Sequence, residues 1–73
     1  MKISQALEGR RVRLIHIHGD VFEGRVGDYI YPEDNEPEGI ASIDMDYPLR
    51  NGKKVNAIIG FNENEIASIE IIE

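Results

Sequence analysis

Residues Gly9–Val26, which read GRRVRLIHIHGDVFEGRV, give the clearest indication of the fold. Polar and apolar residues alternate from Arg11 to Leu14, as they do in a β-strand with one buried face. Residues 15–18 alternate in the opposite phase. This strand therefore twists or contains a bulge, unless both of its faces are covered. A His-Gly-Asp turn at residues 18–20 then leads into a second strand.

The second strand, residues 21–31, brings Phe22, Gly24 and Val26 to one side. A glycine on the inward side of a strand allows a sharp bend, which small closed barrels require. Residues 32–39 contain two prolines, four acidic residues, one Asn and one Gly, and this composition predicts a loop.

Three more strands are predicted after the loop. They cover residues 40–47, 55–61 and 66–72. In the first of them, Ile43, Met45 and Tyr47 are expected to point inward. Asn51-Gly52 is a strong signal for a tight hairpin between the first two. A polar turn separates the last two.

One short helix is predicted at the N-terminus, because Ser4 is a suitable N-cap and Gly9 a suitable terminator. A flat five-stranded sheet would leave two exposed edges, so closure into a barrel is favoured. We therefore expect a single domain over residues 1–73. Its fold is mainly β, a small, strongly bent five-stranded antiparallel barrel with a short N-terminal helix.

Size and composition point to self-association. The chain has 73 residues and no cysteine, so neither a disulfide nor a cysteine-based metal site can stabilise its small core. Oligomerisation is the usual remaining way to stabilise such a domain. No apolar run approaches the roughly 18 residues of a membrane span, and no signal-peptide pattern is present. We expect a cytoplasmic protein without a membrane partner.

Charge is distributed unevenly along the chain. The formal net charge is −6. Residues 26–49 contain seven acidic and no basic residues, whereas residues 1–25 contain five basic and three acidic ones. The acidic segment would repel a phosphate backbone unless the basic strand lies on a separate face. It is also typical of a solvated loop that keeps a protein soluble.

The residues from Gly9 to Val26 resemble the Sm-like family of small β-barrels. The shared features are an alternating basic and apolar strand, a Gly turn, an aromatic residue, a bend glycine and an aliphatic residue. Residues 58–60 and 66–69 are similar to the family's fourth and fifth strands. The resemblance implies a ring or a dimer in which the fourth strand of one copy pairs with the fifth strand of the next.

The RNA-binding motifs of that family are not matched. Ile30 stands where the family's Asp would be, and Asp34 and Asn35 are adjacent instead of spaced apart. The Arg of the second motif is missing beside Gly60. The resemblance therefore implies no base-binding pocket at these positions.

Four isoleucines fall out of phase with the inward residues of their strands. They are Ile15, Ile17, Ile58 and Ile72. Outward isoleucines on a small barrel form an apolar patch, and such patches usually mark an interface. We expect these residues to form the contact surface of a homo-oligomer.

Two further surfaces are candidates for partner binding. Tyr29, Tyr31, Asp34, Asn35 and Tyr47 lie in or near the acidic loop. Aromatic and acidic residues together favour a basic or proline-bearing protein partner, although strand packing also explains the tyrosines. The alternative is an RNA-binding surface, which would consist of Arg10, Arg11, Arg13 and Arg25.

Catalysis and cofactor binding are not predicted. His16 and His18 lie on one side of a strand, where they could bind a metal ion or pack as hydrogen-bonded structural histidines. The acidic loop lacks the spacing of a calcium-binding EF-hand. No serine has a recognisable base partner, and no phosphate-binding glycine loop occurs. We expect a non-enzymatic binding or assembly module without a cofactor.

Overall fold

The computed structural model describes residues 2–73, so Met1 of the predicted domain lies outside the described residues. All strand pairs are antiparallel. The strands are β1 (Arg11–His16), β2 (Val21–Ile30), β3 (Ser42–Arg50), β4 (Lys53–Lys54), β5 (Ile58–Asn62) and β6 (Ile66–Ile71). Three single 3-10 turns, η1 (Gln5–Leu7), η2 (Pro32–Asp34) and η3 (Glu63–Glu65), accompany them.

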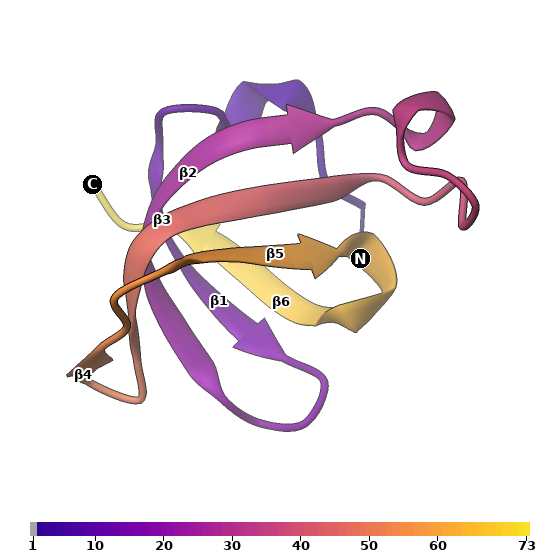
Figure 1. The fold of residues 1–73 in the computed structure, drawn as a ribbon. Helices are drawn as coiled ribbons and strands as arrows, with labels where there is room; N and C mark the ends of the chain where they lie inside the picture. Colours follow the sequence, from indigo (N-terminus) through magenta and orange to yellow (C-terminus); the bar gives the residue numbers. More distant parts are fainter. Residues whose placement is uncertain (1) are drawn as a thin grey trace.

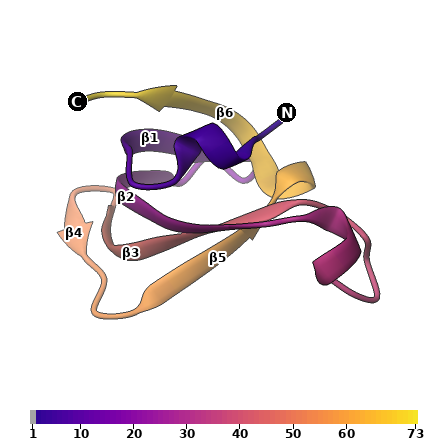
Figure 2. The same cartoon turned by 90° about the horizontal axis from the view of Figure 1, so that it is seen from above.

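The strands form one sheet in the order β4-β3-β2-β1-β6, and β5 also pairs with β3, next to β4. β5 and β6 are therefore outer strands, each paired on one side within residues 2–73. The sheet is strongly bent (Figure 1). Seen from above, β1 and β6 lie on one side of the molecule and β3 and β5 on the other (Figure 2).

The observed fold corrects the prediction in three respects. Six strands occur instead of five, because the two residues of β4 pair with the end of β3 across the predicted Asn51-Gly52 hairpin. The sheet is open, since β5 and β6 are not paired with each other in residues 2–73. The N-terminal helix is a single 3-10 turn over Gln5–Leu7, because so short a segment cannot offset the cost of helix nucleation.

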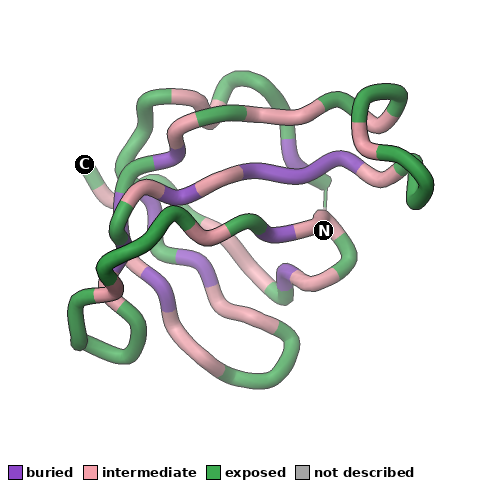
Figure 3. Tube along the Cα trace, viewed as in Figure 1, coloured by how far each residue is buried: buried purple, intermediate pink, exposed green. Residues whose placement is uncertain are grey.

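The core lies between the two sides of the bent sheet that Figure 2 separates, and the buried parts of the chain are drawn in purple in Figure 3. Its buried apolar residues are Ile3, Val12, Leu14, Phe22, Val26, Ala41, Ile43, Met45, Phe61 and Ile66. The rings of Phe22 and Phe61 meet edge to face, with centroids 4.8 Å apart. Ile3 joins this core, and its N–H donates to the Glu63 carboxylate at 2.9 Å. The N-terminal segment is thereby attached to η3.

The sequence predicts that Tyr47 points inward, but the structure does not bury it. Its side chain is 54% exposed, and Pro48 is fully buried instead. Glu23 pairs with Leu49 but Arg25 pairs with Asp46, so two residues of β3 lie opposite Gly24 of β2. This β-bulge reverses the inward and outward phase of β3. Tyr47 adopts a left-handed conformation at the bulge, with φ of 48°.

Gly24 lies at the bend of β2, where the strand comes closest to β3. The residue is buried, and a Cβ atom added to it would lie 3.1 Å from Pro48 Cα. Because Pro48 Cα is a backbone atom, it cannot move away without distorting the bulge. The predicted role of Gly24 as an inward bend residue agrees with this contact.

We expect Gly24→Ala to lower the free energy of unfolding by about 1–3 kcal/mol, because the new methyl group overpacks this contact. Urea denaturation followed by circular dichroism measures the change. Gly27→Ala is the matched control, since the atoms nearest to its Cβ belong to the side-chain carboxylate of Asp46, at 2.8 Å, and not to the backbone. Equal losses in the two variants would contradict the role assigned to Gly24.

Candidate functional site

The free edge of β5 presents unpaired backbone groups. Tyr47 N–H donates to Ala57 O at 3.1 Å, and Glu63 N–H donates to Ala41 O at 2.8 Å. These bonds at both ends of the ladder show that the odd-numbered residues of β5 bond to β3. Alternate residues of an antiparallel strand direct their backbone groups to opposite sides. Ile58 and Gly60 therefore direct their N–H and C=O groups to the free edge.

The same reasoning applies to β6. Ile72 N–H donates to Arg11 O at 2.9 Å, and Glu70 lies opposite Arg13 two residues further along. The even-numbered residues at this end of β6 therefore bond to β1. Ile69 and Ile71 direct their backbone groups to the free edge.

Neither edge carries the usual protection against strand pairing. Natural edge strands are often protected by lysine, proline or inward-pointing charges. β5 reads IIGFN and contains no charged residue and no proline. β6 reads IASIEI, and its one charged residue, Glu70, is engaged by Arg13. Both strands are therefore suited to accept another strand.

Exposed isoleucines lie on both edges. Ile58 is 57% exposed on β5, and Ile71 is 44% exposed on β6. Of the four isoleucines predicted to form an interface, Ile17 is also exposed, while Ile15 and Ile72 are only half-buried. Ile71 is not among the four isoleucines predicted from the sequence. It lies opposite the buried Val12, but no strand within residues 2–73 covers its other side.

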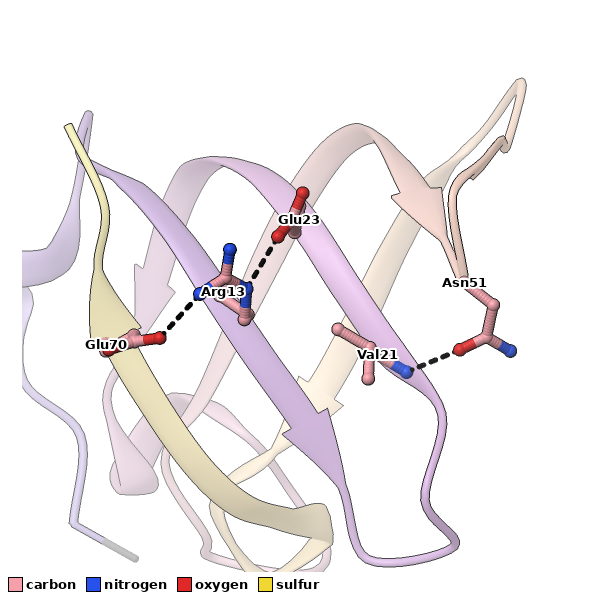
Figure 4. A network of polar contacts seen from close by, with 5 residues as sticks. All are labelled: Arg13, Val21, Glu23, Asn51 and Glu70. Atoms are coloured by element: carbon pink, nitrogen blue, oxygen red, sulfur yellow. Dashed lines mark hydrogen bonds and ion pairs between the residues drawn. The ribbon is translucent and has the colours of Figure 1, made fainter.

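Two of the four arginines predicted to bind RNA are engaged in ion pairs. Arg13 lies between two carboxylates (Figure 4), with Nε 2.6 Å from Glu23 Oε2 and Nη1 2.8 Å from Glu70 Oε1. Arg13 donates both hydrogen bonds, and the bond to Glu23, followed by the bond to Glu70, raises the pKa of Arg13. Arg10 binds Glu73 and thereby lowers the pKa of that carboxyl. The positive charge of both arginines is largely compensated.

Arg11 and Arg25 remain as the other two arginines. They lie directly opposite each other on β1 and β2, and both are exposed. Within residues 2–73, neither forms an ion pair. Like charges in directly opposite positions destabilise a sheet. The structure therefore leaves two adjacent guanidinium groups available to a partner.

The residues predicted to bind a protein partner do not form one surface. Tyr29 and Tyr31 meet edge to face, with ring centroids 4.9 Å apart. The Tyr31 hydroxyl donates to Gln5 Oε1 at 2.7 Å, which ties the pair to η1. Tyr47 is separated from them along β3, since Tyr29 pairs with Ile43, four residues earlier.

Asn35 has a structural role in the acidic loop. Its side-chain amide donates to Ile40 O at 2.6 Å and to Asn62 Oδ1 at 3.2 Å. These bonds join the loop to the end of β5. Asp34, by contrast, is exposed in η2. Of this adjacent pair, only the aspartate is accessible to a partner.

The two histidines interact with each other at the end of β1. The imidazole rings of His16 and His18 have centroids 5.0 Å apart. His16 is half-buried, and its Nδ1 accepts a hydrogen bond from the His18 N–H at 3.1 Å. In the part of the chain that the structure describes, no three His, Cys, Asp or Glu residues are placed to hold a metal ion. This geometry is that of hydrogen-bonded histidines at a turn.

A group of carboxylates lies beside β5. Burial, followed by the negative charges of Asp28 and Asp46, raises the pKa of Asp44. Asp44 is the β3 partner of Gly60, and its Oδ1 would lie 3.3 Å from a Cβ atom at that glycine. Residues 26–49 contain no lysine or arginine, and Arg25, the β2 partner of Asp46, forms no ion pair within residues 2–73. This part of the sheet therefore carries net negative charge next to the free edge.

The pKa shift of Asp44 predicts a pH dependence of stability. Because the folded-state pKa is raised, the folded chain binds the proton more tightly than the unfolded chain, and stability falls as the pH rises through this range. We expect Asp44→Asn to stabilise the protein at neutral pH by less than about 1 kcal/mol, since the carboxyl group is partly solvated. The gain should disappear in acid, where Asp44 is protonated.

Asp20→Asn is the control, and its effect on stability at neutral pH should have the opposite sign. Hydrogen bonds from Asn51 and Arg50 lower the pKa of Asp20, so its contribution to stability is present above its unfolded pKa and is lost as the pH falls. Urea midpoints between about pH 3 and about pH 7 cover both carboxyl groups. If Asp44→Asn lowers stability at neutral pH, the inferred repulsion of Asp44 by Asp28 and Asp46 is wrong.

Comparisons with known proteins give no match: no protein-family model, no curated protein and no solved structure is significantly similar to the chain. The resemblance to the Sm-like family thus stays a prediction based on Gly9–Val26. Across residues 2–73, no helix has the length and apolar character needed to cross a bilayer.

Proposed function

We propose that the chain is a non-enzymatic assembly module in which β5 of one copy pairs antiparallel with β6 of a second copy. The observation that supports this proposal is the presence of two open, unprotected strand edges, each with an exposed isoleucine. The two edges are different surfaces of the chain, so the contact would be heterologous. Repeated heterologous contacts produce either a closed ring or an open filament.

The orientation of the side chains supports this pairing. Ile58 lies next to the core-facing Ile59 and therefore points away from the core. Ile71 lies opposite Val12 and points to the core side of β1 and β6. Directly opposite residues of an antiparallel pair lie on the same face. Pairing of the two free edges would thus continue the outer face of one copy into the core face of the next.

This arrangement brings the exposed isoleucines together. The register that overlaps both strands along their length places Ile58 opposite Ile71 and Gly60 opposite Ile69. In each of these pairs, both residues direct their backbone groups to the free edge, as hydrogen bonding requires. Full burial of an isoleucine side chain contributes about 1.5–3 kcal/mol. The contact would therefore add apolar burial that a 73-residue chain lacks by itself.

The barrel that the Sm-like resemblance implies belongs to the same proposal. Within one chain, the bent sheet is open between β5 and β6. A strand from a neighbouring copy would cover each of these edges, so that no edge is left exposed. In a closed ring, every copy would be completed in this way.

The other predicted functions have less support. An RNA-binding surface on the arginines would rely mainly on Arg11 and Arg25, because the other two are ion-paired. A basic or proline-bearing partner at the acidic loop would meet Tyr31 and Asn35, whose polar groups already bond within the chain. Neither surface has an unpaired backbone edge.

The proposal predicts that the wild-type protein self-associates and that a charge on either edge prevents it. We expect Ile58→Lys and Ile71→Lys to be monomeric, because a lysine would be buried without a partner in the paired sheet. Both side chains are exposed in the isolated chain, so the fold should be retained. Size exclusion with light scattering over a range of micromolar concentrations measures the copy number.

Ile17→Lys is the matched control for these variants. Ile17 is 54% exposed, close to the 57% of Ile58, but it lies in the turn after β1 and outside both edge strands. This variant should associate like the wild type. A wild-type protein that stays monomeric at every concentration would overturn the proposal, and so would equal behaviour of Ile17→Lys and Ile58→Lys.

A further inference from the structure

The free edge of β5 is short, and the chain itself sets its limits. Ile58 and Gly60 direct their N–H and C=O groups away from β3, as the hydrogen bonds at both ends of the ladder require. At the end of the strand, the Asn62 N–H donates to Glu65 Oε1 at 2.7 Å. An extended segment that joins this edge would therefore exchange backbone hydrogen bonds with Ile58 and Gly60.

The Asp44 carboxylate lies over this edge. Asp44 is the β3 partner of Gly60, so the two residues share the outer face of the sheet. Asp44 Oδ1 lies 3.3 Å from the position that a Cβ atom of Gly60 would take. Asp46 is turned the other way, because its Oδ1 lies 2.8 Å from the corresponding position at Gly27 of β2. Of these two aspartates, Asp44 is the one that faces the free edge.

The negative charge of Asp44 is uncompensated. Within residues 2–73, neither Asp44 nor Asp46 forms an ion pair. Burial, followed by repulsion from Asp28 and Asp46, raises the pKa of Asp44. A cationic group brought to the edge by a partner would relieve this repulsion.

The register of the edge places such a cation. In an antiparallel segment on β5, the residue opposite Gly60 lies on the outer face, with its Cβ about 4.5–5.5 Å from the Cβ position of the glycine. Its Cβ would thus lie at most about 9 Å from Asp44 Oδ1, a gap that a lysine or arginine side chain spans. Two residues further along, the segment meets Ile58, which is 57% exposed. The edge therefore suits a basic residue followed, two positions later, by an apolar one.

A second copy of the chain does not supply this cation. The strand that the proposed pairing brings to the edge is β6, which reads IASIEI and contains no lysine or arginine. In the register that pairs Gly60 with Ile69, an aliphatic side chain would lie nearest to Asp44. A segment with a basic residue at that position complements the edge better than β6 does.

We propose that the free edge of β5 binds an extended segment of a partner protein, with an arginine or lysine of that segment opposite Gly60 and beside the Asp44 carboxylate. Strand addition to a sheet edge is an established mode of peptide recognition. The inference uses the edge of a single chain, so it does not require that copies pair. Where copies do pair, the segment competes with β6 of the neighbour and thereby limits assembly.

The test is a peptide titration followed by heteronuclear NMR. The probe is an acetylated and amidated peptide with the order Ser-Thr-Arg-Val-Ile-Thr-Ser, whose arginine comes opposite Gly60 and whose isoleucine comes opposite Ile58. It is added to Ile71→Glu, a variant whose new carboxylate would lie beside the acidic part of β3 in the proposed pairing, so that copies stay apart. The amide signals of Ile58 and Gly60 should shift most, because these N–H groups gain hydrogen bonds.

Two matched changes test the charge. Glutamine in place of the peptide's arginine should raise the dissociation constant roughly 3- to 10-fold, as expected for the loss of one partly solvated, charge-assisted contact. Asp44→Asn should weaken the arginine peptide to the same extent and leave the glutamine peptide unaffected. Asp46→Asn is the matched control, since it removes the same charge from a carboxylate turned toward Gly27, and its effect should be smaller.

The outcomes separate this inference from the proposed function. Equal binding of the arginine and glutamine peptides, or equal effects of Asp44→Asn and Asp46→Asn, would overturn it. Shifts confined to residues away from β5, or no shifts with either peptide at millimolar concentration, would do so too. If the wild type never associates, the pairing of copies is wrong, but the titration still decides this inference.

An associating wild type gives a second readout. The arginine peptide should lower the copy number measured by light scattering, because it occupies the edge that a neighbour needs. An unchanged copy number at saturating peptide would show that the two do not share this edge and would contradict the inference.

Discussion

The close approach of Gly24 to Pro48 sets the curvature of the sheet, and most other features depend on it. β2 can bend over β3 at this point because Gly24 has no side chain, and a Cβ atom there would lie 3.1 Å from the Pro48 backbone. The bend brings β1 and β6 over β3 and β5 (Figure 2) and encloses the core between them. At the same bulge, Tyr47 is exposed and Pro48 is buried. The bend and the exposure of Tyr47 thus arise at one place in the sheet.

The bend also has a consequence for the edges. The bent sheet encloses its core although its outer strands are not paired with each other. In the part of the chain described, β5 and β6 each have one free edge. Arg13 binds carboxylates on the two strands beside β1, and Arg10 binds Glu73 beyond the end of β6. The pKa of Asp44, by contrast, is raised by burial and by nearby acids. Among the described residues, the groups left without a partner include the free edges of β5 and β6 and the guanidinium groups of Arg11 and Arg25.

The alternation of polar and apolar residues predicted the buried faces of the regular strands well, but it failed at the bulges. β1, the hairpin at Asn51-Gly52, the acidic loop and the inward Gly24 were predicted, because each depends on local spacing or turn chemistry. The orientation of Tyr47 was predicted wrongly, because an extra residue in β3 shifts the phase without a signal in the alternation. Ile71 was missed because its exposure depends on its place at the edge of the sheet, which the sequence does not contain.

The mainly β character, the positions of the turns and the division of charge along the chain follow from the residue types and their spacing, so they could be predicted from the sequence. The identity of the edge strands, the pairing of the arginines and the exposure of Tyr47 became visible in the folded structure. Those properties depend on the register between strands that are distant in sequence. Arg13, for example, meets Glu70 only because β1 lies beside β6, 57 residues apart along the chain.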